Sequence, residues 1–210
     1  MSELFSLQRP MSDKNVLLLL EQLRSVKGNY LIIADENWAQ TNWADLENHC
    51  QCELHIISNR YDIAQQAEAS GLSVTFSDLD FSNFKNRHYD GILLRVCKER
   101  ASTHHVINHA SHLLKPQGSL ILSGDKNDGV KAYVKKACHL FDDRTAAKKN
   151  GNNYLATITL YPSEQAPLDD KDYAKIRNTE ALAEFSLRSK PGIFGWEKVD
   201  RGSAFLVEHL

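Results

Sequence analysis

The chain has 210 residues, of which 42% are hydrophobic and 25% charged, as is ordinary for a globular protein. This length provides one full domain with an extension, or two small domains, and enough apolar residues to exclude a fully disordered chain. The formal net charge of −2 excludes a globally basic nucleic-acid binder but leaves a local basic face open. No apolar run approaches the ~20 residues that cross a bilayer, and Met1–Pro10 lacks a secretory signal pattern. We therefore expect a cytoplasmic protein with no membrane partner.

The first half of the chain alternates segments that predict helices with apolar runs that predict strands. A helix over Val16–Val26 precedes Tyr30–Ala34, whose continuous apolar run is typical of a strand buried on both faces. The alternation continues as helix, strand, helix and strand over Trp38–Cys50, Cys52–Ser58, Tyr61–Ser70 and Leu72–Ser77.

The second half of the chain continues the alternation and ends it with a hairpin. Lys115–Gly118 predicts a turn, and Asn150–Asn153 predicts the loop of a hairpin between Arg144–Lys149 and Tyr154–Leu160. The order predicts an α/β fold with a doubly wound, mostly parallel seven-stranded sheet and an antiparallel C-terminal hairpin strand. It resembles the element order of class I methyltransferases. The strands and helices before the hairpin are expected over Tyr89–Val96, Ala101–Leu114, Ser119–Ser123 and Asn127–Phe141.

The composition changes after residue 160. Two prolines and an acidic pair indicate a linker over residues 161–189, within which Leu182–Leu187 predicts a short strand. A turn over Lys190–Gly195 and an apolar helical pattern over Ser203–Leu210 follow. Because that pattern stops without a cap, we expect the chain to be cut at a domain boundary.

The turn after the first strand lacks the residues that a nucleotide-type cofactor requires. Ligands of open parallel sheets bind beyond the carboxyl ends of the strands, and glycines there allow the backbone to approach them closely. The residues Ala34–Gln40 contain no glycine. We expect Trp38 to fill the space that a cofactor needs, and Asp35 and Glu36 to repel a carboxylate or phosphate.

Two further turns lack the expected residues. The second strand ends in Ser58-Asn59-Arg60, with no carboxylate to bind ribose hydroxyls, although Asn59 could still accept a hydrogen bond. The fourth strand ends in Arg95-Val-Cys-Lys98, with neither the prolines nor the aromatic residue of an amino-directed methyltransferase. The sequence therefore predicts a methyltransferase-type fold in which all three functional turns are missing.

The last 21 residues carry a more specific resemblance. They resemble the PGVFS-x3-LD-x-GS segment of the ribosomal RNA guanine-N2 methyltransferases, either the small-subunit 16S enzyme or its large-subunit relative. Leu122–Lys131 is similar to the VVGENRSGVRS stretch of the same family. Gly195 departs from the usual serine of the motif. The matching positions are Pro191, Gly192, Phe194, Asp200, Gly202 and Ser203.

The resemblance implies a chain of two tandem methyltransferase-like domains. In this family the N-terminal copy is degenerate, and the C-terminal copy binds S-adenosylmethionine and carries the catalytic turn. Residues 1–160 would then be the degenerate copy, without cofactor, and residues 190–210 the truncated start of the catalytic copy. The catalytic residues would lie outside this chain. Phe194, Asp200 and Gly202 would be near the cofactor of the full-length enzyme. The implied partners are the protein's own C-terminal catalytic domain and ribosomal RNA or a ribosomal subunit.

A local excess of positive charge marks residues 124–150. Four carboxylates lie in the same stretch, which leaves a net charge of +3. Such a face could hold RNA phosphates, although a solvated lysine-rich flank is the alternative interpretation. Lys131 and Lys135 lie one helical turn apart and share a face. The candidate RNA-binding residues are Lys126, Lys131, Lys135, Lys136, Arg144, Lys148 and Lys149.

Other constellations leave two alternatives open. The chain could be a free-standing protein- or RNA-interaction module, or an active α/β enzyme that uses Cys97, which ends a strand next to Lys98. Four histidines of one predicted helix do not follow a zinc motif, so we expect a polar flank and no metal site. We expect the cysteines to be reduced thiols. These histidines and cysteines are His104, His105, His109 and His112, and Cys50, Cys52, Cys97 and Cys138.

Overall fold

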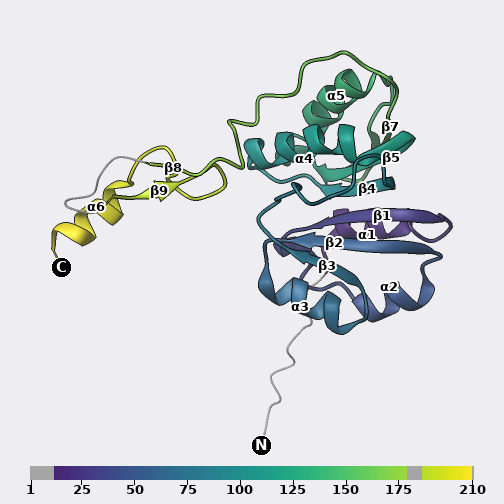
Figure 1. The fold of residues 1–210 in the computed structure, drawn as a ribbon, viewed down its shortest axis with the longest axis horizontal. Coiled ribbons are helices and arrows are strands. Elements are labelled where there is room, and N and C mark those ends of the chain that lie inside the picture. Colours follow the sequence, from purple (N-terminus) through teal and green to yellow (C-terminus); the bar gives the residue numbers. More distant parts are fainter. Residues whose placement is uncertain (1–11, 179–185, 210) are drawn as a thin grey trace, which may run out of the picture.

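The computed structural model describes residues 12–178 and 186–209, and its main body is a seven-stranded sheet (Figure 1). The strand order is β3-β2-β1-β4-β5-β7-β6. Strands β1 to β5 pair in parallel, whereas β7 is antiparallel to both β5 and β6. This topology confirms the predicted fold class. The strands are β1 (Gly28–Ala34), β2 (Cys52–Ser58), β3 (Ser73–Phe76), β4 (Tyr89–Arg95), β5 (Leu114–Asp125), β6 (Lys148–Asn150) and β7 (Asn153–Thr159).

Helices cover both faces of this sheet, with α4 and α5 on one side and α2 and α3 on the other (Figure 1). Leu31 and Ile33 of β1 contribute to one core cluster, and Tyr30 and Ile32 to the other, because successive side chains of a strand point to opposite faces. The apolar run of β1 is therefore buried on both faces. The helices are α1 (Lys14–Glu21), η1 (Glu36–Trp38), α2 (Trp43–His49), α3 (Tyr61–Ala69), α4 (Arg100–Leu113), η2 (Lys126–Asp128) and α5 (Val130–Phe141).

Two local predictions are wrong. The single helix expected over Trp38–Cys50 is divided into η1 and α2, because the Asn42 side chain accepts from the Asp45 N–H at 3.2 Å and starts a new helix. The turn expected over Lys115–Gly118 belongs to β5, whose pairing with β4 shifts register after Tyr89. Gln117 adopts a positive φ of 65° in this irregular part of the strand.

The residues after β7 return across the main body before forming a small separate unit. Tyr173 is 3% exposed and belongs to the core cluster that α4 and α5 cover. Beyond it, β8 (Arg177–Asn178) and β9 (Arg188–Ser189) form a two-stranded antiparallel sheet, and α6 (Arg201–Glu208) follows. The predicted turn and terminal helix are confirmed. Most of the predicted strand over 182–187 lies outside the described residues. Within those residues, no helix is long and apolar enough to cross a membrane.

Candidate functional site

A cavity of about 170 Å³ lies at the carboxyl ends of the central strands. This edge of an open parallel sheet is where such folds bind their ligands. Pockets for drug-sized ligands have volumes of ~300–1,000 Å³, so the cavity is small for a nucleotide-type cofactor. It is lined by residues of β1, β4 and α4, by the segments that follow β1, β2, β3 and β4, and by two residues from the C-terminal segment: Ile33, Ala34, Asp35, Glu36, Asn59, Leu79, Leu94, Arg95, Cys97, Glu99, Ser102, Thr103, Val106, Tyr173 and Gly192.

Two charged groups at this edge are bound by other groups of the protein. Asp35 accepts from the Asn37 N–H at 3.1 Å and starts η1. Burial, with a smaller contribution from Glu36, raises the pKa of Asp35 to about 6. Arg95 is bound by two carboxylates, those of Asp13 at 3.3 Å and Asp128 at 3.0 Å. Its positive charge is therefore compensated within the protein.

Trp38 does not occupy the cavity, so that prediction is wrong. The indole is fully buried, stacks on Trp43 with ring centroids 5.9 Å apart, and belongs to the core cluster on the α2 and α3 side of the sheet. The cavity instead opens among residues of the cluster that α4 and α5 cover. Tyr173 and Gly192, which sequence reasoning did not connect with this edge, close part of it.

Tyr173 and Lys190 are held by a single carboxylate, that of Asp78. The Tyr173 hydroxyl donates to Asp78 Oδ1 at 2.9 Å, and Lys190 Nζ lies 2.6 Å from Asp78 Oδ2. The Lys190 ammonium also lies 4.3 Å from the centroid of the Tyr173 ring. Burial alone would raise the pKa of Asp78, but the bonds from Lys190 and Tyr173 outweigh it and lower the pKa. We call this arrangement the Asp78 clamp.

Two histidines of α4 hold the segment that leads to the clamp. His104 Nδ1 lies 2.7 Å from the carbonyl oxygen of Asp169, and its Nε2 lies 3.0 Å from Lys136 Nζ. His105 Nδ1 lies 2.9 Å from Asp170 Oδ2. Both rings are buried, which corrects the expectation of a polar flank. No group of three or more His, Cys, Asp or Glu in residues 12–178 and 186–209 is placed to hold a metal ion.

A groove of about 570 Å³ beside α5 gathers part of the predicted basic surface. Lys131, Lys135 and His139 follow one another at four-residue steps, about 6 Å apart along the helix axis, and Arg144 adds a fourth basic group. The neighbouring Asp143 carboxylate accepts from backbone N–H groups, including that of Thr159 at 2.6 Å. These hydrogen bonds outweigh burial and lower its pKa. We call this feature the basic groove. The four-residue spacing of His139 from Lys135 is visible in the sequence, so its place on this face could have been predicted.

The remaining candidate RNA-binding residues lie elsewhere. Lys126 is in η2, beside the β6–β7 turn, where its N–H donates to the Asn152 carbonyl at 3.2 Å. Lys136 faces α4. Its pKa is lowered there, mainly by burial and to a smaller extent by the charge of Arg100. Lys148 and Lys149 are exposed on the short strand β6. The structure therefore brings together three of the seven predicted residues, namely Lys131, Lys135 and Arg144.

The motif residues of the C-terminal segment have distinct positions. Phe194 is 89% exposed, and the Asp200 carboxylate accepts from the Gly202 N–H at 2.9 Å and thereby caps α6. Cys97 Sγ lies 3.4 Å from Ser102 Oγ and 3.6 Å from the Glu99 carbonyl oxygen. Neither neighbour is a general base, so this geometry does not activate a thiol nucleophile.

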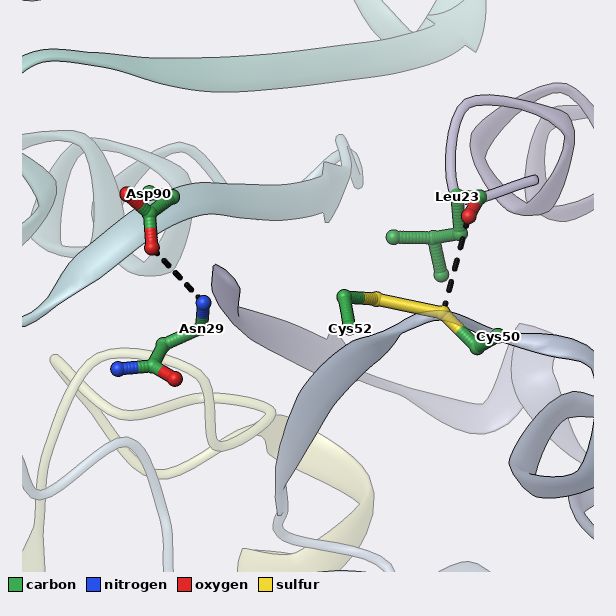
Figure 2. The surroundings of a disulfide bond; sticks show 5 residues. All are labelled: Leu23, Asn29, Cys50, Cys52 and Asp90. Carbon is green, nitrogen blue, oxygen red and sulfur yellow. Dashed lines mark hydrogen bonds between the residues drawn. A yellow bond between two sulfur atoms is a disulfide. The ribbon is translucent and has the colours of Figure 1, made fainter. Parts of the chain in front are cut away.

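The cysteines differ from the expectation of four reduced thiols. Cys50 and Cys52 are joined by a disulfide at the start of β2 (Figure 2), whereas Cys97 and Cys138 are free. The expectation rested on the absence of a secretory signal and on the spacing of the pair. Neither feature tells how closely the backbone brings the two residues together.

The sheet order, the antiparallel seventh strand and the position of the cavity define a class I methyltransferase-like fold. Curated proteins named ribosomal RNA small subunit methyltransferase C are similar in sequence. That of Shewanella piezotolerans is 28% identical over 125 residues, covering 58% of this chain and 36% of the relative. That of Shewanella halifaxensis is 24% identical over 160 residues, covering 76% and 46%. No family model matches the chain.

Solved structures agree on the fold. The T. thermophilus 16S rRNA N2 G1207 methyltransferase, solved with AdoMet and guanosine, superposes with a TM-score of 0.75 at 20% identity, over 95% of this chain and 52% of that one. The ribosomal protein L11 methylase of Lactobacillus delbrueckii gives a TM-score of 0.52 at 11% identity, over 69% and 77%. The chain spans about half, or less, of the length of the small-subunit methyltransferases that it matches.

Proposed function

We propose that this chain is the N-terminal, S-adenosylmethionine-incompetent half of a ribosomal RNA guanine-N2 methyltransferase. Residues 1–160 form the degenerate domain, residues 161–189 the linker, and residues 190–210 the start of the catalytic domain. The half supports the catalytic domain and contacts ribosomal RNA, while methyl transfer is performed by residues outside this chain. The similarity to small-subunit methyltransferases supports this assignment.

The residues at the carboxyl edge of the sheet do not fit S-adenosylmethionine. The cavity is about 170 Å³, and the Tyr173 side chain and the Gly192 backbone take up part of the edge. Asp35, Glu36 and Glu99 place carboxylates around it, which would repel the carboxylate of the cofactor's methionine part. The end of β2 offers Asn59, whose amide donates to Asp78 at 3.3 Å.

The Asp78 clamp is the observation that carries the proposed supporting role. Asp78 follows β3, whereas Lys190 directly precedes Pro191-Gly192, which resemble the start of the family's catalytic domain. The ion pair is mostly desolvated on the Lys190 side, where the side chain is 12% exposed. The degenerate domain thus fixes the position of the segment from which the catalytic domain continues.

The basic groove is the site that we propose for ribosomal RNA. Lys131, Lys135 and Arg144 present three positive charges around one depression, and His139 lies in line with the two lysines. The Asp143 carboxylate is turned towards backbone donors, so it opposes a phosphate less than a free carboxylate would. Binding of this kind is electrostatic and depends on salt.

Two titrations test the proposal. In calorimetry, the 210-residue chain is expected to give no heat of binding with S-adenosylmethionine, under conditions in which the full-length protein binds it. Micromolar affinity of the chain itself would refute cofactor incompetence. A labelled fragment of small-subunit ribosomal RNA is expected to bind the chain with an affinity that falls as salt rises. A response that is independent of salt, or no binding, would remove the RNA role.

A further inference from the structure

Cys50 and Cys52 lie at the edge of the sheet opposite the cavity, where α2 ends and β2 begins. Residues two apart in an extended chain point to the same face. A bend at Gln51 shortens the distance between their Cα atoms to 5.5 Å, whereas two steps of a regular strand span about 6.6 Å. The backbone therefore brings both sulfur atoms to one face within the separation that a disulfide requires.

The pair is accessible and closes a very short loop. Both cysteines are partly exposed, and Gln51 between them is exposed. The stabilisation that a disulfide gains by restricting the unfolded chain grows with the length of the loop that it closes. Because only one residue separates Cys50 from Cys52, the bridge gains little from this source. Exposed disulfides are also the ones that exchange most easily with small thiols.

The surroundings of Cys50 can accommodate the reduced state as well. Cys50 Sγ lies 3.7 Å from the carbonyl oxygen of Leu23, which follows α1 and points towards the sulfur (Figure 2). A thiol can donate a hydrogen bond to this oxygen, whereas a disulfide sulfur carries no proton. Cys50 also borders a cavity of about 390 Å³ between α1 and α2, through which a small reagent can approach. Reduction therefore replaces the covalent bond with a hydrogen bond at the same position.

We infer that Cys50 and Cys52 form a reversible thiol–disulfide site that exchanges with low-molecular-weight disulfides. One cysteine thiolate attacks a sulfur of the small disulfide, forms a mixed disulfide and releases one small thiolate. The other cysteine thiolate then attacks the protein sulfur of the mixed disulfide, closes the bridge and releases the second small thiolate. The cysteine pair loses two electrons and two protons, and the small disulfide is reduced to two thiols.

A redox titration of the 210-residue chain tests this inference. The chain is equilibrated at a series of ratios of reduced to oxidised glutathione, quenched with acid, denatured and alkylated, and its intact mass is measured. We expect two alkyl groups at oxidising ratios and four at reducing ratios, because Cys97 and Cys138 are the free cysteines of the structure. Four groups at every ratio, or two at every ratio, would overturn the inference.

Two variants locate the exchange. C52S is expected to retain one glutathione on Cys50 at oxidising ratios, because the mixed disulfide has no second thiol to resolve it. C97S is the matched control: it loses one alkyl group at every ratio and keeps the transition. A transition that disappears in C97S would assign the chemistry to another pair. If C52S does not fold, the redox titration of the unsubstituted chain alone tests the inference. Its outcome does not depend on whether the chain binds cofactor or RNA.

Discussion

Removing the Asp78 carboxylate should release the C-terminal segment without unfolding the sheet. The substitution Asp78→Ala deletes the two charge-assisted hydrogen bonds that hold the C-terminal segment, from Tyr173 at 2.9 Å and from Lys190 at 2.6 Å, together with the 3.3 Å bond from Asn59. Such bonds contribute about 1.5–3 kcal/mol each when well buried. The Asp78 side chain is 42% exposed, so solvent screening reduces each contribution to about 1 kcal/mol. We therefore expect the local opening free energy of the segment to fall by about 2 kcal/mol, or roughly 30-fold in the opening equilibrium.

Hydrogen–deuterium exchange read by mass spectrometry measures this change directly. Backbone amides of residues 171–178 and 186–198 should exchange roughly 30-fold faster in Asp78→Ala, while those of β1 and β4 keep their protection. Asp80→Ala is the matched control, because this nearby exposed carboxylate accepts from the Ser82 N–H at 2.9 Å, two residues along the chain. The clamp would be refuted if the amides of these C-terminal residues exchanged at the same rate in Asp78→Ala and Asp80→Ala. An equal loss of protection throughout the sheet would also refute it.

Three further predictions concern the core, the cavity edge and the groove. Trp38→Ala should destabilise the chain by about 3–5 kcal/mol in denaturant unfolding, because the indole is fully buried; a loss below about 1 kcal/mol would contradict its place in the core. Burial raises the pKa of Asp35 to about 6, so stability should fall progressively as the pH rises from about 4 to about 6, because the unfolded state has released a proton that the folded state still holds. Asp35→Asn should remove that slope in pH-dependent unfolding and gain up to about 3 kcal/mol at pH 7; an unchanged slope would assign it to other groups. In the double variant Lys131→Glu/Lys135→Glu, the affinity for ribosomal RNA should fall less steeply with salt, and the magnitude of the slope of log affinity against log salt should decrease by about 2. The control Lys85→Glu, far from the groove in sequence, should leave this slope unchanged.

The fold was predictable because its signals are local. Runs such as Tyr30–Ala34 are apolar at every position, which is what a strand covered by helices on both faces requires. The capping that divides η1 from α2 is also local, but the Asn42 cap lies within a stretch whose apolar spacing suits one continuous helix. Spacing predicts which residues are buried, whereas the side chain of a single polar residue decides where the helix begins.

The candidate site was less predictable because its contacts join distant parts of the chain. The rule that open parallel sheets bind ligands beyond the carboxyl ends of their strands directed attention to the edge where the cavity lies. The side of the sheet on which Trp38 lies depends on how η1 leaves β1, and no periodicity gives that direction. The bond between Asp78 and Lys190 spans more than a hundred residues, so neither residue type nor spacing could reveal it. His104 and His105 were visible as a cluster, but their partners Asp169 and Asp170 were not.

The short strand β6 has a consequence for how this chain behaves at high concentration. It stands at one end of the sheet order, so among the described residues no strand pairs with the other side of its backbone. Lysines on an outermost strand discourage two sheets from joining edge to edge, and β6 carries Lys148 and Lys149 within three residues. Neutralising both would therefore appear first as concentration-dependent light scattering. A loss of RNA affinity in such a variant must be interpreted only after self-association has been measured.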